Sequence, residues 1–402
     1  MTEAALRIAS PTAWILSGPS APGWAWGDPA GGYAERVSED VARRIRRAIR
    51  DRGPITFAEF MEHALYGPGG FYEKPPVGER GHFVTAPHVH PVFAELVHRA
   101  LRGLWEGLDR PRPFSVVEVG AGDGTLARDL LRLGDDEQEP PIAFAAVERS
   151  QGARARLAEL PIRVAAHLGE LGPLDPGVVL ANELLDNLPF RRVRRTTGAL
   201  AEVRVDARAN GFHEIEVPCD DDLAATAASL RPGEEAIVPV DALRFVDELA
   251  GTLRRGYALL VDFGSAGGPA GDVHGYRDHR VFEDVLLDPG TADITAGVDF
   301  DAIAHGAEAG GLRVLGLVSQ RDALFGVGFG DWSEAQRGRQ GRLMAEGAGG
   351  RAVRVWEGRG RADLLVDPAG LGRLRWMLLA TPGLPPPAWL AHARAGHRPT
   401  AD

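Results

Sequence analysis

The feature that most constrains the fold is the stretch VVEVGAGDG, residues 116–124, in which three glycines stand at alternate positions after an apolar run. In the segment that follows, Leu126, Leu130 and Leu133 have the spacing of one helical face. Glycines let a ligand approach the backbone closely, and a helix N-terminus offers free N–H groups. The stretch therefore predicts a strand, a turn and a helix that hold a nucleotide-like cofactor. The alternative is a glycine turn in an α/β core without a ligand.

The spacing of the glycines distinguishes between cofactors. A dinucleotide-binding fingerprint, G-x-G-x-x-G, needs a glycine at position 125, where this chain has Thr125. Glu118 stands two residues before the first glycine. A carboxylate there would repel a pyrophosphate but would suit a cation. S-adenosylmethionine carries a sulfonium and an amino group, so we predict S-adenosylmethionine rather than NAD.

The composition is that of an ordinary globular protein with room for more than one domain-sized unit: 402 residues, 44% hydrophobic and 25% charged. The net charge of −11 gives no reason to expect nucleic-acid binding. No apolar run approaches the roughly 18 residues of a membrane span, and the acidic start does not resemble a signal peptide. The single cysteine, Cys219, excludes an intrachain disulfide and a cysteine-based metal site. We expect a cytoplasmic protein with no metal and with no nucleic-acid or membrane partner.

Polar side chains follow two further apolar runs that read as strands. Residues 142–147 end at Glu148, where an acid can accept hydrogen bonds from ribose hydroxyls. Residues 178–181 end in Asn182, Glu183 and Asp186. Ligands in open α/β sheets bind beyond the carboxyl ends of the strands, so this second cluster is a candidate for the reacting edge of the site. The alternative is a helix cap by Asn182 with two solvated acids.

The remaining pattern predicts a large α/β unit with additions. Strands are expected over residues 163–166, 257–261 and 312–318, and turn residues between alternating stretches predict β-hairpins over 191–218. A long Gly-rich loop without secondary structure is expected after residue 264. The expected division is a flexible arm (1–32), a helical cap with a cofactor and substrate loop (33–110), a core (111–190 and 236–325), a β-hairpin insertion (191–235), and a mobile excursion that returns to the core (326–402).

These motifs together resemble the MidA-type S-adenosylmethionine-dependent methyltransferases, the family of the mitochondrial complex I assembly arginine methyltransferase. The most specific piece is ANELLDNLP, residues 181–189. The resemblance also rests on these stretches: ITFAEFM at 55–61, GFY at 70–72, GHFVTAPHVHP at 81–91, EVGAGDG at 118–124, DFG at 262–264, Tyr276-x-x-His279, and DIT at 293–295. The motifs run in order from about residue 40 to 380.

The resemblance implies a Rossmann-like class I methyltransferase sheet with helices on both faces, a helical N-terminal cap and an inserted region of β-hairpins and loops. It also implies a set of cofactor contacts: Thr85, Glu118, Gly120, Ala121, Gly122, Glu148, Arg149 and Asn182. The family's loop usually reads Gly-Asp-Phe and ends in Pro-Glu, whereas this chain has His82 and His88. This departure suggests an acceptor other than the family's known protein arginine.

Methyl transfer needs an acceptor atom with a free lone pair, so a proton must leave that atom at or near the transition state. We expect Glu183 and Asp186 to anchor and polarise a cationic or hydroxyl acceptor. His82, His88 or His279 would then be the base, because the unperturbed pKa of histidine is near 6.5. Each histidine could instead be a surface or hydrogen-bonding residue. A metal site at His82, His88 and His90 is a weaker alternative.

Three functions remain open at this point. The first is methyl transfer to an N or O nucleophile of a small molecule or peptide, for example in natural-product tailoring. The second is a protein arginine methyltransferase that acts on an assembly partner. The third is an assembly factor that binds the cofactor without turnover. An acidic enclosed cleft would favour a guanidinium acceptor, whereas an apolar pocket would favour a tailoring substrate. The sequence does not predict an oligomeric state.

Overall fold

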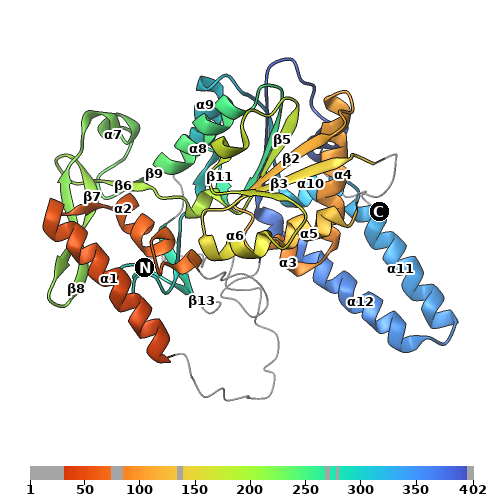
Figure 1. Cartoon of the computed structure of the whole chain (residues 1–402), viewed down its shortest axis with the longest axis horizontal. Coiled ribbons are helices and arrows are strands. Elements are labelled where there is room, and N and C mark those ends of the chain that lie inside the picture. The colour runs from red at the N-terminus through yellow and green to blue at the C-terminus, as the bar shows by residue number, and fades with distance from the viewer. Residues whose placement is uncertain (1–30, 74–84, 134–138, 268–271, 278–279, 396–402) are drawn as a thin grey trace, which may run out of the picture.

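The computed structural model describes residues 31–73, 85–133, 139–267, 272–277 and 280–395, and its centre is a seven-stranded sheet (Figure 1). The strand order across this sheet is β16-β17-β10-β5-β2-β3-β4. The strands are β2 (Phe114–Val119), β3 (Ile142–Val147), β4 (Arg163–Ala165), β5 (Gly177–Asn182), β10 (Gly256–Asp262), β16 (Arg313–Ser319) and β17 (Arg375–Ala380). The predicted α/β sheet is confirmed.

The direction of the strands gathers the polar residues of the sequence motifs. The neighbouring strands β10, β5, β2, β3 and β4 run parallel, whereas β17 is antiparallel to both β10 and β16. Both faces of the sheet are covered, so the central strands are apolar runs, and β10 is buried along its whole length. The residues at and just beyond the carboxyl ends of β2, β3, β5 and β10 therefore meet at one edge of the sheet.

Helices cover both faces of the main sheet, as predicted. On one face lie α4 (Val92–Gly107), α5 (Thr125–Leu131), α10 (Gln320–Gly326) and α13 (Ala388–Ala395). On the other face lie α8 (Val240–Thr252) and α9 (Phe300–Ala309). The helical spacing of apolar residues in α4 places Phe93, Leu96 and Leu104 in the core against this sheet.

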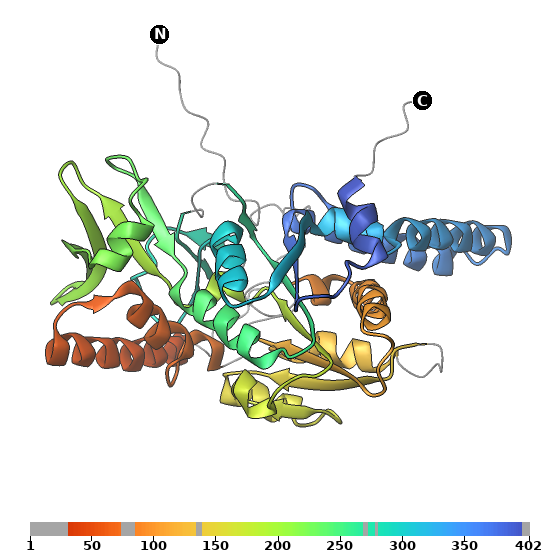
Figure 2. The ribbon, with the colours of Figure 1, turned by 90° about the horizontal axis from the view of Figure 1, so that it is seen from above.

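A second sheet and the N-terminal helices form a lobe beside the main sheet (Figure 2). Its strand order is β1-β7-β6-β9, with β8 paired to β7. The strands are β1 (Ile55–Thr56), β6 (Arg191–Arg195), β7 (Leu200–Arg208), β8 (Gly211–Pro218) and β9 (Glu235–Val238), and the helices are α1 (Gly31–Arg52) and α2 (Phe57–Met61). This sheet therefore crosses the boundaries expected from the sequence. Strand β1 lies in the expected cap (33–110), and β9 begins at the last residue of the expected insertion (191–235) and continues into the expected core.

The segment after β10 differs from the loop without secondary structure that we expected. The described residues of this segment contain five short strands: β11 (Gly264–Ser265), β12 (His274–Arg277), β13 (Arg280–Phe282), β14 (Asp293–Thr295) and β15 (Val298–Asp299). Strands β13, β12 and β14 form a small antiparallel sheet. Runs of two to four residues are too short to show the alternation by which a strand is recognised.

Residues 326–361 also differ from the mobile excursion that we expected. They contain α11 (Phe329–Ala345) and α12 (Gly349–Asp363), which pack on each other and extend away from the body (Figures 1 and 2). Glycines such as Gly338 and Gly341 lie inside α11, and an interior glycine costs about 1 kcal/mol relative to alanine, so the local helix signal of this stretch is weak. No helix in the described part of the chain has the length and apolar character of a membrane span.

A capping box at Thr56 begins helix α2. The Thr56 hydroxyl accepts the backbone N–H of Glu59 at 3.1 Å, and the Glu59 carboxylate accepts the backbone N–H of Thr56 at 2.9 Å. Helix α2 then continues into the π-helical turn η2 (Glu62–Tyr66), which reaches the edge of the main sheet. The cap therefore fixes the start of a segment that contributes residues to the site described below.

We predict that T56A lowers the free energy of unfolding by about 1 kcal/mol, because one backbone N–H at the start of α2 loses its acceptor. T56S is the matched control, since serine also caps helices, and it should stay within about 0.5 kcal/mol of the wild type. Denaturant unfolding monitored by circular dichroism measures both changes. Equal stability of T56A and the wild type would contradict the role of the cap.

Candidate active site

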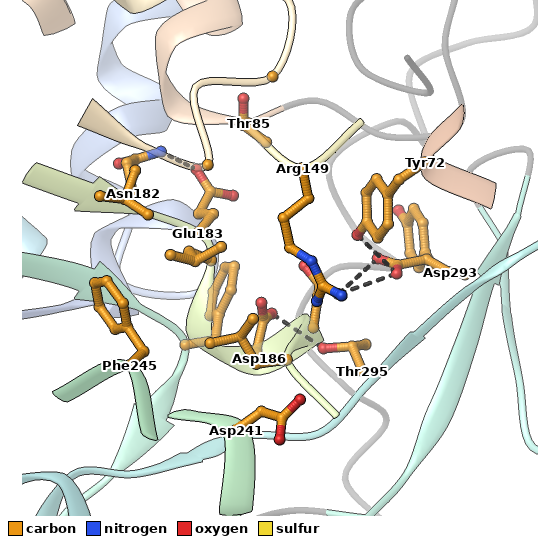
Figure 3. Close-up of a pocket in the computed structure, with 18 of the residues that line it drawn as sticks. Tyr72, Thr85, Arg149, Asn182, Glu183, Asp186, Asp241, Phe245, Asp293 and Thr295 are labelled. Carbon is orange, nitrogen blue, oxygen red and sulfur yellow. Dashed lines mark hydrogen bonds between the residues drawn. The ribbon is translucent and has the colours of Figure 1, made fainter. Parts of the chain in front are cut away.

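A cavity of about 1620 Å³ lies at the carboxyl edge of the main sheet, and residues of the lobe complete its wall. Figure 3 shows Asn182 and Glu183 on one side of it and Tyr72 and Asp293 on the opposite side. The side chain of Arg149 extends between these two sides. The sheet edge, the lobe and the loop that contains β14 thus all contribute to one site.

The glycine loop has the backbone that its sequence requires. Gly120, Gly122 and Gly124 have φ values of +76°, +56° and +77°, in the left-handed region that favours glycine. A Cβ atom at Gly120 would lie 2.9 Å from a methyl carbon of Leu184. At Gly122 a Cβ atom would meet no atom within 4 Å, because that residue faces the cavity. The loop therefore presents bare backbone to a ligand.

Glu118 is buried at the base of this loop, with only 4% of its surface exposed, and it lines the cavity. Its Oε2 atom is buried and has no hydrogen-bond partner among the described residues. Burial, together with the neighbouring carboxylates of Asp123 and Glu148, raises the pKa of Glu118 to about 8. A buried acid in this state is an acceptor for a cationic or N–H-bearing ligand, as the sequence predicts for S-adenosylmethionine.

Glu148 and Arg149 follow β3 on the other side of the glycine loop. The two oxygens of Glu148 accept backbone N–H groups of Gly122 and Ser150 at 2.9 and 2.8 Å, while burial raises its pKa. Each oxygen keeps a lone pair for a ligand hydroxyl. The Arg149 guanidinium lies 4.3 Å from the centre of the Tyr66 ring and donates to Glu62 at 2.7 Å. Arg149 therefore ties the cofactor side of the cavity to the lobe.

Glu183 lies in a strained backbone conformation directly after β5. Its φ is +52°, which costs of order 1–3 kcal/mol for a residue with a side chain and is typical of functional sites. Its Oε1 atom accepts the backbone N–H of Ala86 at 3.0 Å and the amide of Asn182 at 3.1 Å. Burial and Asp186 raise the pKa of Glu183 to about 7, although the N–H of Ala86 opposes the shift. The Oδ1 atom of Asn182 is buried and has no partner among the described residues.

Asp186 and Asp262 form a pair of carboxyl groups at the same edge. Asp262 is fully buried and accepts the backbone N–H of Leu185 at 2.6 Å. Asp186 accepts the hydroxyl of Thr295 at 3.0 Å through Oδ2, whereas its buried Oδ1 has no partner in the described part of the chain. Burial raises the pKa of both groups, to about 7 for Asp262. The carboxylates of Asp262 and Asp293 add to the shift of Asp186, and that of Glu183 adds to the shift of Asp262.

The sequence motifs contained three further site residues to which we had assigned no role. Asp293 accepts hydrogen bonds from the Tyr72 hydroxyl at 2.8 Å and from the Asn187 amide at 2.9 and 3.0 Å. Burial raises the pKa of Asp293 to about 6. This network binds the wall of the lobe to the turn that carries Asp186. Tyr72 and Asp293 are 221 positions apart, so no local sequence pattern could pair them. The only signal in the sequence was that both residues belong to family motifs.

Of the three histidines proposed as bases, the structure describes only His88. His82 and His279 lie outside the described residues. Both ring nitrogens of His88 are engaged, Nδ1 with the Thr85 hydroxyl at 2.9 Å and Nε2 with Asp123 at 3.1 Å. His88 therefore contacts the glycine loop rather than the acids at Glu183 and Asp186. Among the residues that the structure describes, no group of three or more metal-ligating side chains comes together. His82 is not among these residues, so the alternative of a metal site at His82, His88 and His90 is not tested.

Comparison with known proteins identifies the family of the chain. Residues 96–318 match a family model, Methyltransf_28, described as S-adenosyl-L-methionine-dependent methyltransferase. The chain is 31% identical over 330 residues to the protein arginine methyltransferase NDUFAF7 homolog of Drosophila melanogaster, which covers 72% of this chain and 75% of the relative. It is 29% identical to human protein arginine methyltransferase NDUFAF7, with 74% and 75% covered.

A solved structure resembles nearly the whole chain. It comes from Burkholderia thailandensis, was crystallised with S-adenosyl-homocysteine, and superposes with a TM-score of 0.76 at 26% identity, covering 92% of this chain and 97% of the other. The family and the cofactor predicted from the sequence are thereby confirmed. The curated relatives are named as mitochondrial proteins, which contradicts the cytoplasmic location that we expected.

We predict that E118Q raises the melting temperature of the cofactor-free protein at pH 8 but weakens S-adenosylmethionine binding by about 10- to 100-fold. Glu118 keeps its proton up to about pH 8 when folded but loses it near pH 4.5 when unfolded. Wild-type stability therefore falls as pH rises from about 4.5 to 8, by ~1.4 kcal/mol for each unit of pKa difference. Glutamine does not titrate, so the gain should be small at pH 5 and large at pH 8.

Differential scanning fluorimetry at both pH values and calorimetric titration measure these effects. E202Q is the control, because Glu202 is 1% exposed but bonded to Arg191 and Arg204. Removing its charge should lower the melting temperature, because two arginines lose their partner. An E118Q protein that is less stable than the wild type at pH 8 would contradict our interpretation of Glu118.

Proposed function

Because the chain belongs to the MidA-type family of S-adenosyl-L-methionine-dependent methyltransferases, we propose that its methyl acceptor is the guanidinium group of an arginine in a protein or peptide. The methyltransferase activity and the cofactor follow from the family. The identity of the acceptor is our own inference, and it rests on the chemistry of the cavity.

The observation that carries this proposal is the placement of unpartnered buried oxygens. Within the described residues, three buried side-chain oxygen atoms have no hydrogen-bond partner: Glu118 Oε2, Asn182 Oδ1 and Asp186 Oδ1. All three residues line the same cavity. Leaving a buried acceptor unpaired costs about 1–3 kcal/mol, and more if the group is charged. Such a set of oxygens favours ligands that bring N–H donors and positive charge.

Two cations can satisfy these oxygens. Glu118, at the glycine loop, suits the positive charge of the cofactor, and Glu148 suits its ribose hydroxyls. Bound S-adenosylmethionine supplies an electrophilic methyl group on its sulfonium. Glu183 and Asp186, at the end of β5, are then left to face the acceptor. A guanidinium carries five N–H donors in a planar fork and matches two carboxylates that lie on one turn of the chain.

The acids at the turn give the acceptor its orientation and take its proton. Glu183 is held by Ala86 and Asn182 through one oxygen, so its other oxygen can bind an acceptor N–H. Asp186 offers its unpartnered Oδ1. When the acceptor nitrogen forms its bond to the methyl carbon, the bond from that carbon to the sulfonium sulfur would break with its electron pair on sulfur, S-adenosyl-homocysteine would be the leaving group, and the proton on the nitrogen would pass to one of these carboxylates. The arrival of the cation lowers their raised pKa values and so keeps at least one of them ionised.

Two further facts support arginine over a small-molecule acceptor. The relatives from Drosophila melanogaster and Homo sapiens are named protein arginine methyltransferases. In addition, Glu183, Asp186 and Asp293 all line the cavity, so its wall carries several acidic side chains. An apolar tailoring substrate would have to bury these acids without neutralising them, which is costly.

We predict that the protein methylates arginine-containing peptides and that E183Q and D186N each lower kcat/KM by about 10²- to 10⁴-fold, because each removes a carboxylate that holds the acceptor and takes its proton. Transfer of a labelled methyl group, followed by mass spectrometry of the peptide, measures both the product and the rate. S-adenosylmethionine affinity should change far less in these variants than in E118Q.

E216Q is the matched control, because Glu216 pairs with Arg194 on the inserted sheet and does not line the cavity. Its kcat/KM should equal that of the wild type. Turnover on small amines or hydroxyl compounds but not on arginine would contradict the proposal. Tight cofactor binding without turnover on any acceptor would favour the third function, an assembly factor that binds the cofactor without catalysis.

A further inference from the structure

We propose that His88 and Asp123 are positioning residues that form a latch between the glycine loop and Glu183. The latch fixes the position of the acceptor-binding acid relative to the cofactor loop. This proposal rests on the proposed function, because it assigns the latch a role in holding Glu183 for the acceptor. The latch runs through the turn 85–88 and is built from five hydrogen bonds.

The first part of the latch joins this turn to the glycine loop. His88 Nε2 lies 3.1 Å from Asp123 Oδ2 and 3.1 Å from the Thr125 hydroxyl. Asp123 in turn accepts the backbone N–H of Thr125 at 3.0 Å. Burial alone would raise the pKa of Asp123, but the hydrogen bond from His88 lowers this pKa to about 2. Asp123 therefore stays ionised. An ionised carboxylate only accepts hydrogen bonds, and the His88 ring must therefore donate from Nε2.

The second part joins the turn to the acceptor side. The Thr85 hydroxyl lies 2.9 Å from His88 Nδ1, and the backbone N–H of Ala86 donates to Glu183 Oε1 at 3.0 Å. These residues belong to α3 (Ala86–Val89), a helix of four residues with Thr85 as its N-cap residue. A single helical turn has almost no stability of its own. The side-chain contacts of His88 are therefore what keeps the Ala86 N–H pointed at Glu183.

Glu183 depends on this support because its other neighbours oppose its charge. Asp186 on the following turn and Asp262 at the end of β10 are both acidic. The groups that favour the ionised form of Glu183 are the Ala86 N–H, the Asn182 amide and the His88 ring. Two of these three belong to the latch. If the latch opens, Glu183 loses support for its negative charge although none of its own atoms has changed.

This arrangement makes an unusual prediction about the sign of a mutational effect. Asp123 does not touch Glu183, and removing its negative charge would by direct electrostatics make Glu183 easier to ionise. If the latch acts as proposed, D123A instead frees the turn 85–88 and makes Glu183 harder to ionise. The two mechanisms therefore move the acid limb of the pH–rate profile in opposite directions.

The test compares D123A with the wild type and with D129A at saturating S-adenosylmethionine. Asp129 lies on α5 like Thr125 and pairs with Arg132, so D129A removes the same charge without touching the latch. We expect the acid limb of D123A to move up by about 0.5–1 pH unit and that of D129A to stay in place. D123N, whose amide can bond a His88 ring of the other tautomer, should restore most of the wild-type profile. A downward shift in D123A would overturn the latch.

A second readout does not depend on the acceptor. Amide hydrogen exchange of a peptide that begins before residue 84 and ends near residue 92, measured with S-adenosyl-homocysteine present, reports the protection of the Ala86 N–H. We expect D123A and H88A to speed this exchange several-fold and D129A to leave it unchanged. Wild-type protection in D123A would refute the latch. If no arginine peptide is methylated, the proposed function fails, and the exchange data alone still decide whether the latch exists.

Discussion

The burial of several carboxyl groups close together, where their charged forms lose solvation and repel one another, is the constraint on which the rest of this site depends. Glu118, Glu148, Glu183, Asp186 and Asp262 all meet at the carboxyl edge of one sheet, because the strands that lead to them run parallel. Their surroundings raise the pKa of each, so each group keeps its proton to a higher pH than an isolated acid would. Cationic ligands relieve this repulsion, and two cations, a sulfonium and a guanidinium, fit the places where oxygens lack partners. The site is therefore less stable by itself than it is with its substrates, as is usual where catalytic groups gather.

The parts outside the main sheet serve chiefly to hold this edge. The lobe reaches it through Tyr66 and Tyr72, which bond the backbone of Asn187 and the carboxylate of Asp293. The turn 85–88 reaches it through His88 and Ala86. The strained backbone of Glu183 persists because hydrogen bonds from three different segments surround it. A rigid wall of this kind suits a reaction in which positioning supplies much of the rate acceleration.

The sequence predicted the sheet and the cofactor loop well, because both leave strong local signals. The apolar runs that became β3 and β5 and the glycines after β2 are recognisable without any tertiary information. The contacts that complete the acceptor side join residues far apart in the chain. Tyr72 and Asp293, or Ala86 and Glu183, could not be paired by any local rule. The same limit explains why His88 was proposed as a base: its residue type suggested proton transfer, but its place next to Asp123 is a property of the fold. The helices α11 and α12 were missed because their glycines weaken the local helix signal.

The most direct test of this account is to count the protons released when the cofactor binds. Calorimetric titration at pH 7 in buffers with different ionisation enthalpies gives this number for S-adenosylmethionine and for S-adenosyl-homocysteine. With the pKa of Glu118 at about 8 in the free protein, a cationic group of the cofactor placed beside it should expel about one proton. S-adenosyl-homocysteine keeps the amino group but has an uncharged sulfide, so the difference between the two ligands shows which charge acts on Glu118. Binding of S-adenosylmethionine without proton release would contradict the claim that the buried acids at this edge bind a cation.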